Sequence, residues 1–213
     1  MPKVEKDLHA FDDWLTILKY KLPLIGFRRN LTFAASCCQR AIPNYALFAR
    51  QAHWGDHKLL MKALAVIWGS VLEPGAKPND SYATALLKAI ASITPDTETP
   101  FESQLTSAAL DACVSVSEVL SYTNDEDSNH ILTVSSLARD TIYLYVQYTE
   151  NSDYSNKRFE ETILSHPLMI AEMKEQQDDF QILASNTSEA PEFWLSFRDR
   201  AQRKRTSNLG LSL

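Results

Sequence analysis

The sequence predicts an all-α fold, a single-domain helical bundle of about seven to nine helices over residues 1–213. Three observations carry this prediction. Hydrophobic residues recur at intervals of three and four along most of the chain, and no segment alternates between hydrophobic and polar residues as a half-buried strand does. Glycine is scarce, with five residues in 213, which disfavours folds that need many tight hairpins. The chain has no fixed-period repeat and no low-complexity linker, so one domain is expected.

The first helix is expected within residues 1–22 as an amphipathic helix packed on the rest of the domain. It should end at Pro23, because proline has no amide hydrogen for a helical hydrogen bond. The hydrophobic stripe of this helix has heptad-like spacing, which suits packing onto its own domain or onto a second copy of the chain. A homodimer is therefore one expected possibility. The stripe consists of Leu8, Phe11, Leu15, Leu18 and Leu22.

A second helix is expected from about Leu31 to Ile42, with Pro43 ending it and Asn44 capping a short helix that follows. Gly55-Asp56 interrupts the pattern again, and Asp56 is placed to cap a helix that extends to Val71. That helix is hydrophobic almost all round, which predicts a place at the centre of the bundle.

The later helices follow from similar signals. Asn79 is expected to open a helix through Ile90, and Thr99-Pro100-Phe101-Glu102 has the pattern of a capping box that opens the next. Further helices are expected around Ile131–Tyr145, on both sides of Pro167, and from near Ser188 to a basic end, with 207–213 as a C-terminal tail.

Charge and composition exclude several classes of protein. A net charge of −6 and a pI of about 5.4 argue against general nucleic-acid binding. The N-terminus is charged where a signal peptide is hydrophobic, and no apolar run approaches the ~20 residues that span a bilayer. Cys37, Cys38 and Cys113 fall in hydrophobic helical stretches and are expected to be free core residues. These features predict a cytoplasmic protein without a membrane segment.

Short motifs spread along the chain give it a resemblance to a known family. They are Leu31-Thr32-Phe33-Ala34, Cys38-Gln39-Arg40, Pro43-Asn44-Tyr45-Ala46-Leu47-Phe48, Gly55-Asp56, Ile67-Trp68, Ala109-Leu110-Asp111-Ala112-Cys113-Val114, Ser117-Glu118 and Ser207-Asn208-Leu209-Gly210. In this order they resemble the YjaG-like family of bacterial proteins of unknown function, over roughly residues 27–210. The resemblance implies an all-helical cytosolic domain and supplies no catalytic residues. The N-terminal helix looks longer than in that family.

Asp111 and Glu118 are the main candidates for a functional site. They share one helical face, with Ser115 between them, and carboxylates buried in a bundle need an arginine or a metal as a partner. The alternative is a solvated face, or one buried salt bridge to a residue such as Arg40. Asn44, Tyr45 and Asp56 complete the candidate ligand-binding residues, and no residue is assigned a catalytic role.

No metal and no cofactor are expected. His53 and His57 flank Asp56, but Gly55 interrupts the helix that would aim both imidazoles at one ion, so capping by Asp56 is favoured. The sequence has no nucleotide-binding glycine loop, no nucleophile elbow and no paired Cys-x-x-Cys.

Three hypotheses for function follow. The leading one is a non-enzymatic interaction or regulatory protein of the bacterial cytosol. The alternative is a small-ligand-binding protein or hydrolase that uses Asp111 and Glu118. The third is nucleic-acid association through the basic end of the last helix, at residues 198–205. The third is not favoured, because no aromatic residues interleave with the positive charges for base stacking.

Overall fold

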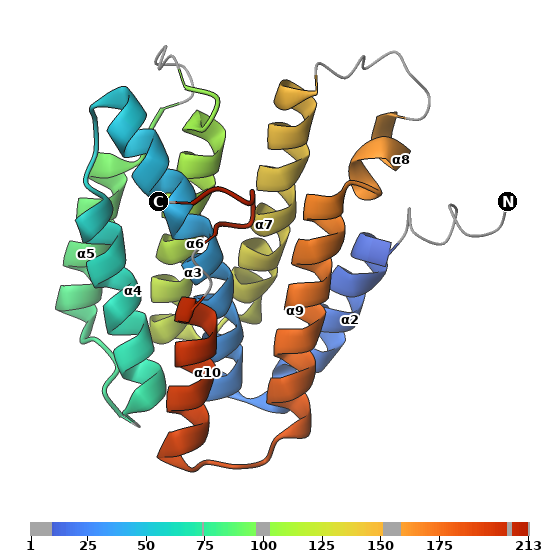
Figure 1. The fold of residues 1–213 in the computed structure, drawn as a ribbon. Helices are drawn as coiled ribbons and strands as arrows, with labels where there is room; N and C mark the ends of the chain where they lie inside the picture. Colours follow the sequence, from blue (N-terminus) through green and yellow to red (C-terminus); the bar gives the residue numbers. More distant parts are fainter. Residues whose placement is uncertain (1–9, 74, 97–102, 151–158, 204–205, 213) are drawn as a thin grey trace, which may run out of the picture.

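The computed structural model describes residues 10–73, 75–96, 103–150, 159–203 and 206–212, and within these ranges the regular secondary structure is helical (Figure 1). An isolated antiparallel bridge joins Thr206 to Ser212. This architecture confirms the predicted all-α bundle. The described helices are α2 (Ala10–Ile25), α3 (Phe27–Ala52), α4 (His57–Leu72), α5 (Asp80–Ile93), α6 (Thr106–Asp125), α7 (Ser128–Thr149), α8 (Phe159–Leu164), α9 (Pro167–Ser185) and α10 (Pro191–Arg203).

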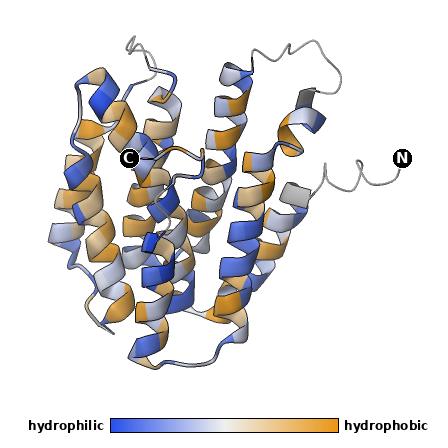
Figure 2. Ribbon diagram, viewed as in Figure 1, coloured by the Kyte–Doolittle hydropathy of each residue, from blue (hydrophilic) through white to orange (hydrophobic). Residues whose placement is uncertain are grey.

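Helix α3 lies at the centre of the bundle. Of its 26 residues 17 are buried, and it contacts α2, α4, α6, α7, α9 and α10. The expectation that the Asp56-capped helix would be central is wrong, because α4 keeps one face in solvent with Lys58, Met61 and Lys62 exposed. Hydrophobic and hydrophilic residues are interspersed along the helices in Figure 2, as amphipathic packing around a shared core requires.

Two prolines expected to end helices lie inside them. α2 continues past Pro23 to Ile25, and α3 continues past Pro43 to Ala52. Pro23 is exposed and lies two residues before the end of α2, so the one hydrogen bond that it cannot donate is at the edge of the helix. Around Pro43 the C-terminal segment lies against the helix, and the carbonyl of Arg40 accepts a hydrogen bond from the amide of Asn208 over 3.0 Å. Asn44 is therefore an interior residue of α3 and not the N-cap of a separate helix.

Four of the described helices, α4, α5, α7 and α9, begin with a capping side chain. Asp56 caps α4 by accepting from the amide of Lys58, and Asn79 caps α5 by accepting from that of Tyr82, as predicted. α6 begins only at Thr106, later than the predicted capping box, which lies outside the described residues in the segment 97–102. The region around Pro167 is split as expected, with this proline at the first turn of α9.

Helix α2 lies at one edge of the bundle, beside α7 and α9 (Figure 1). Trp14, Leu18 and Leu22 bury its inner face in the core. Leu8 lies outside the described residues, as does the side chain of Phe11. None of the described helices is long and apolar enough to cross a membrane.

Candidate functional site

A cluster of charged side chains is buried where α3 packs against α9. Nε and Nη2 of Arg40 donate to the two carboxylate oxygens of Glu172, over 2.9 and 2.7 Å. Nη1 of Arg40 donates to Oδ2 of Asp179 over 3.0 Å, and Ser36 donates to the same oxygen over 2.7 Å. None of these four residues is more than 5% exposed. Buried, charge-assisted hydrogen bonds therefore join α3 to α9.

Gln176 extends this cluster to α2 and α7. Its Nε2 donates to Glu172 over 3.1 Å, and its Oε1 accepts from the hydroxyl of Ser135 over 2.6 Å. The same oxygen accepts from the indole of Trp14 over 3.0 Å. These bonds fix the positions of α2, α3, α7 and α9 relative to one another.

The charges of the cluster are balanced. Arg200 of α10 pairs with Oδ1 of Asp179, so two guanidinium groups face two carboxylates. Burial, the largest single influence, lowers the pKa of Arg40, but the surrounding negative groups, led by the charge and hydrogen bond of Glu172, together outweigh burial and hold that pKa above its usual range. Each carboxylate oxygen accepts at least one hydrogen bond. This closed network positions helices and leaves its carboxylates occupied by partners within the chain.

Sequence reasoning did not single out these α9 residues, although a signal for them exists. Met169, Glu172, Gln176, Asp179 and Leu183 are spaced by three and four residues, so the polar members occupy core positions of one helical stripe. Polar residues at core positions of a helix that must be buried indicate a partnered network.

The structure does not bring Asp111 and Glu118 into one site, because each contacts a different residue of α7. Oδ2 of Asp111 accepts from Thr141 over 2.7 Å, whereas Oε2 of Glu118 lies 2.6 Å from Nδ1 of His130. Asp111 is buried, and burial raises its pKa to about 6. Arg40 was considered as a partner for these carboxylates, but it pairs with Glu172 of α9.

His130 bridges two carboxylates at the α6–α7 turn. Its Nδ1 contacts Glu118, and its Nε2 lies 3.0 Å from Oδ2 of Asp125. Partial burial works to lower the pKa of His130, but the hydrogen bonds to Glu118 and Asp125 outweigh it and raise that pKa. The arrangement is a surface ion pair that tightens the turn when the imidazole is charged.

Asn44, Tyr45 and Asp56 serve different local contacts. Asn44 is buried and donates to Oδ1 of Asn208 over 2.8 Å, which holds the C-terminal segment against α3. The Tyr45 hydroxyl donates to the carbonyl of Ile93 over 2.8 Å and accepts from the amide of Asp56 over 3.2 Å. The structure thus brings Tyr45 and Asp56 together, through the backbone of Asp56.

The basic residues of α10 are paired within the chain. Arg198 pairs with Asp199, Arg200 with a buried carboxylate of α9, and Nε of Arg203 donates to the Asp199 carbonyl. Residues 204–205, the end of the predicted basic run, lie outside the described residues. Two of the basic residues predicted for phosphate contacts, Arg198 and Arg200, are thus already paired with carboxylates of the chain.

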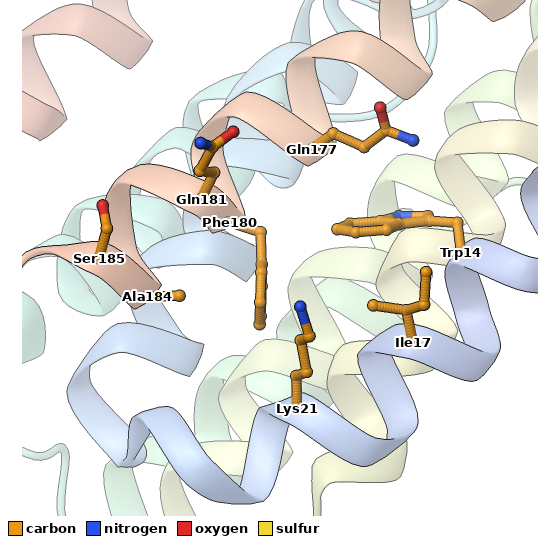
Figure 3. A pocket seen from close by; sticks show the side chains of 8 residues that line it. All are labelled: Trp14, Ile17, Lys21, Gln177, Phe180, Gln181, Ala184 and Ser185. Atoms are coloured by element: carbon orange, nitrogen blue, oxygen red, sulfur yellow. The ribbon is translucent and has the colours of Figure 1, made fainter.

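A groove runs between α2 and α9, with a cavity volume of about 520 Å³. Trp14, Ile17 and Lys21 of α2 form one wall, and Gln177 and Gln181 of α9 lie on the other (Figure 3). The Trp14 side chain forms part of the groove wall and also donates to Gln176 in the buried network. A smaller hollow of about 320 Å³ includes Leu24 and continues toward the α9–α10 connection.

Beside the groove, α2 exposes three large hydrophobic side chains. Ile17, Tyr20 and Leu24 are 41%, 73% and 80% exposed. Their spacing of three and four residues puts them on one side of the helix, opposite the buried Leu18 and Leu22. We call these three side chains the outer face of α2.

A family model described as "Protein of unknown function (DUF416)" matches residues 19–212. The chain is 28% identical over 185 residues to "Uncharacterized protein YjaG" of Escherichia coli K12, which covers 86% of this chain and 90% of that protein. It is 26% identical over 186 residues to the protein of the same name from Salmonella typhimurium, with the same two coverages.

A solved structure shares both the fold and detectable sequence similarity. The crystal structure of a DUF416 family protein from Shewanella baltica superimposes with a TM-score of 0.80 at 26% identity, covering 88% of this chain and 94% of that chain. The family match begins inside α2, at residue 19, and extends into the C-terminal segment. Sequence and fold agree, and the chain belongs to the DUF416 family of proteins of unknown function, which confirms its resemblance to the YjaG-like proteins.

Proposed function

We propose that this chain is a non-enzymatic interaction protein that binds a protein partner through the outer face of α2 and the adjoining groove. The observation that carries the proposal is the exposure of Ile17, Tyr20 and Leu24 on one side of one helix. Contiguous exposed hydrophobic side chains next to a groove are typical of docking surfaces, because water solvates such a surface at a free-energy cost that a partner removes.

Among the described residues, the other large exposed hydrophobic side chains contrast with this face. Met61, Tyr82, Tyr148, Ile170 and Leu195 lie singly on α4, α5, α7, α9 and α10. Isolated exposed hydrophobic residues are ordinary on protein surfaces. The inner face of α2 already supplies its contacts to the core, so the outer face contributes little to the stability of the chain itself.

Cytoplasmic location is part of the proposal. The three cysteines are free and buried, and burial raises the pKa of the Cys113 thiol to about 12, so these thiols are unreactive core residues. Free thiols without disulfides agree with a reducing compartment, and the named relatives come from bacteria.

Site-specific crosslinking in the bacterium that makes the protein tests the proposal. A photo-activatable residue at Thr16, exposed in α2, should give a covalent adduct, and one at Lys62, exposed in α4, should give none. The adduct should disappear in a Tyr20→Ser/Leu24→Ser variant, because the hydrophobic contact is removed.

A matched variant controls for the loss of exposed hydrophobic area. Tyr148 and Ile170 are 56% and 57% exposed on other helices, so Tyr148→Ser/Ile170→Ser should leave the adduct unchanged. Absence of any adduct at position 16, or an adduct that survives the Tyr20→Ser/Leu24→Ser change, would overturn the proposal.

A further inference from the structure

Opposite charges flank the part of the outer face of α2 that Ile17 and Tyr20 form. Asp13 lies at the N-terminal end, one turn before Ile17, and Lys21 lies toward the C-terminal end at the edge of the groove. Both side chains are exposed. Tyr20 and Ile17 lie between the two charges and form the hydrophobic middle of the face.

This pattern is complementary to itself in one orientation only. If a second α2 is laid alongside in the same direction, Asp13 faces Asp13 and Lys21 faces Lys21. If it is laid antiparallel about Ile17, the Asp13 of each copy comes level with the Lys21 of the other, Ile17 meets Ile17, and Tyr20 comes level with Trp14. Opposite charges favour the antiparallel arrangement, because like charges at close range cost free energy.

We infer that the partner of this face is a second copy of the chain, bound through antiparallel α2 helices around a two-fold axis. The inference rests on the proposed function and names its partner. In such a dimer residue i of one copy contacts residue j of the other and the reverse, so one patch serves both copies.

The groove between α2 and α9 is part of the same surface. A stable interface buries about 800 Å² on each partner, more than three side chains supply, so the neighbouring groove has to be covered as well. Tyr20 is the largest exposed side chain of the outer face and lies one residue from Lys21 of the groove wall. In the antiparallel pair it comes level with Trp14 in the groove wall of the second copy, so it supplies the largest hydrophobic contact of the interface.

Charge reversal, followed by rescue with the complementary variant, tests the arrangement. Native mass spectrometry and light scattering measure the mass of the purified chain at about 50 μM, a concentration well above the Kd of a specific micromolar dimer. The wild-type chain should have twice the chain mass. Asp13→Lys alone and Lys21→Glu alone should each weaken dimerisation about tenfold or more, because each creates two like-charge contacts per dimer. An equimolar mixture of the two variants should form a heterodimer at wild-type affinity, since each reversed residue then faces an opposite charge.

Each result decides the inference. Rescue in the mixture supports it, as does loss of the dimer in Tyr20→Ser/Leu24→Ser with retention in Tyr148→Ser/Ile170→Ser. A wild-type chain that is monomeric, or charge variants that dimerise as the wild type does, overturns it. A monomer that still gives an α2 adduct with another protein refutes the self-association and leaves the proposed function standing, whereas absence of any adduct at position 16 refutes the proposed function.

Discussion

Replacing Arg40 by methionine should be the most destabilising single change in the α3–α9 interface. The side chain is 5% exposed and donates three hydrogen bonds to two buried carboxylates. Without it Asp179 keeps Ser36 and Arg200, but Glu172 keeps only the amide of Gln176 among its bonds described above. Removing one partner of a buried ion pair costs about 3–5 kcal/mol, because a charge is left in a poorly solvated place.

Urea unfolding followed by circular dichroism measures this loss. With a slope of about 2–3 kcal/mol per molar urea, the midpoint of Arg40→Met should fall by roughly 1–2.5 M. Arg50→Met is the matched control, since Arg50 lies on the same helix and is exposed, and it should change stability by no more than about 0.5 kcal/mol. Adding Glu172→Gln to Arg40→Met should recover part of the loss by neutralising the stranded carboxylate. Equal midpoints for the two arginine variants, or no recovery in the double variant, would refute the reasoning.

Three further predictions concern stability and pH. Gly55→Ala should destabilise the chain by about 1–3 kcal/mol, because φ at this position is +87° and the new Cβ would lie 2.2 Å from the Tyr45 hydroxyl. Gly69→Ala is the control: the helix has open space at this position, so the change should stabilise the chain by about 0.5–1 kcal/mol in the same denaturation assay. Folding raises the pKa of Asp111 from 3.8 to about 6, so the contribution of this group to stability is lost as the pH rises through 6. The stability of Asp111→Asn relative to the wild type should therefore increase between about pH 4 and 7. Thermal melts across this pH range that show a constant difference in stability between the two proteins would contradict this. The pKa of His130 is raised above 6.5, so its contribution is full below that pH and disappears as the pH rises through the higher folded value; His130→Gln should abolish this dependence.

The candidate site was only partly accessible to sequence reasoning. Asp111 and Glu118 stand seven residues apart on one face, which the sequence shows, but their separate partners Thr141 and His130 depend on how α7 packs against α6. The outer face of α2 was hidden for a similar reason. The periodicity of α2 identifies its inner stripe, which contains Leu18 and Leu22. Only the packed bundle shows that no other helix covers Tyr20 and Leu24.

What the sequence by itself determined is the local structure. The three- and four-residue periodicity predicted helices, and Asp56 and Asn79 cap them as expected, because capping is a contact between a side chain and amides two or three residues away. Burial of the cysteines was likewise predictable from their hydrophobic surroundings.

What only the tertiary structure decided depends on partners far away in the chain. Pro43 breaks a helix by local rules, yet α3 passes through it where residues 207–209 pack against the helix and Asn208 bonds to Arg40 and Asn44. Contacts with distant parts of the chain also decide that α3, and not α4, is the central helix. Arg40 lies 132 and 139 residues from Glu172 and Asp179, and no periodicity shows which buried charges will meet. Such pairings are decided by packing, because a buried ion is tolerated only where the fold supplies its counter-ion.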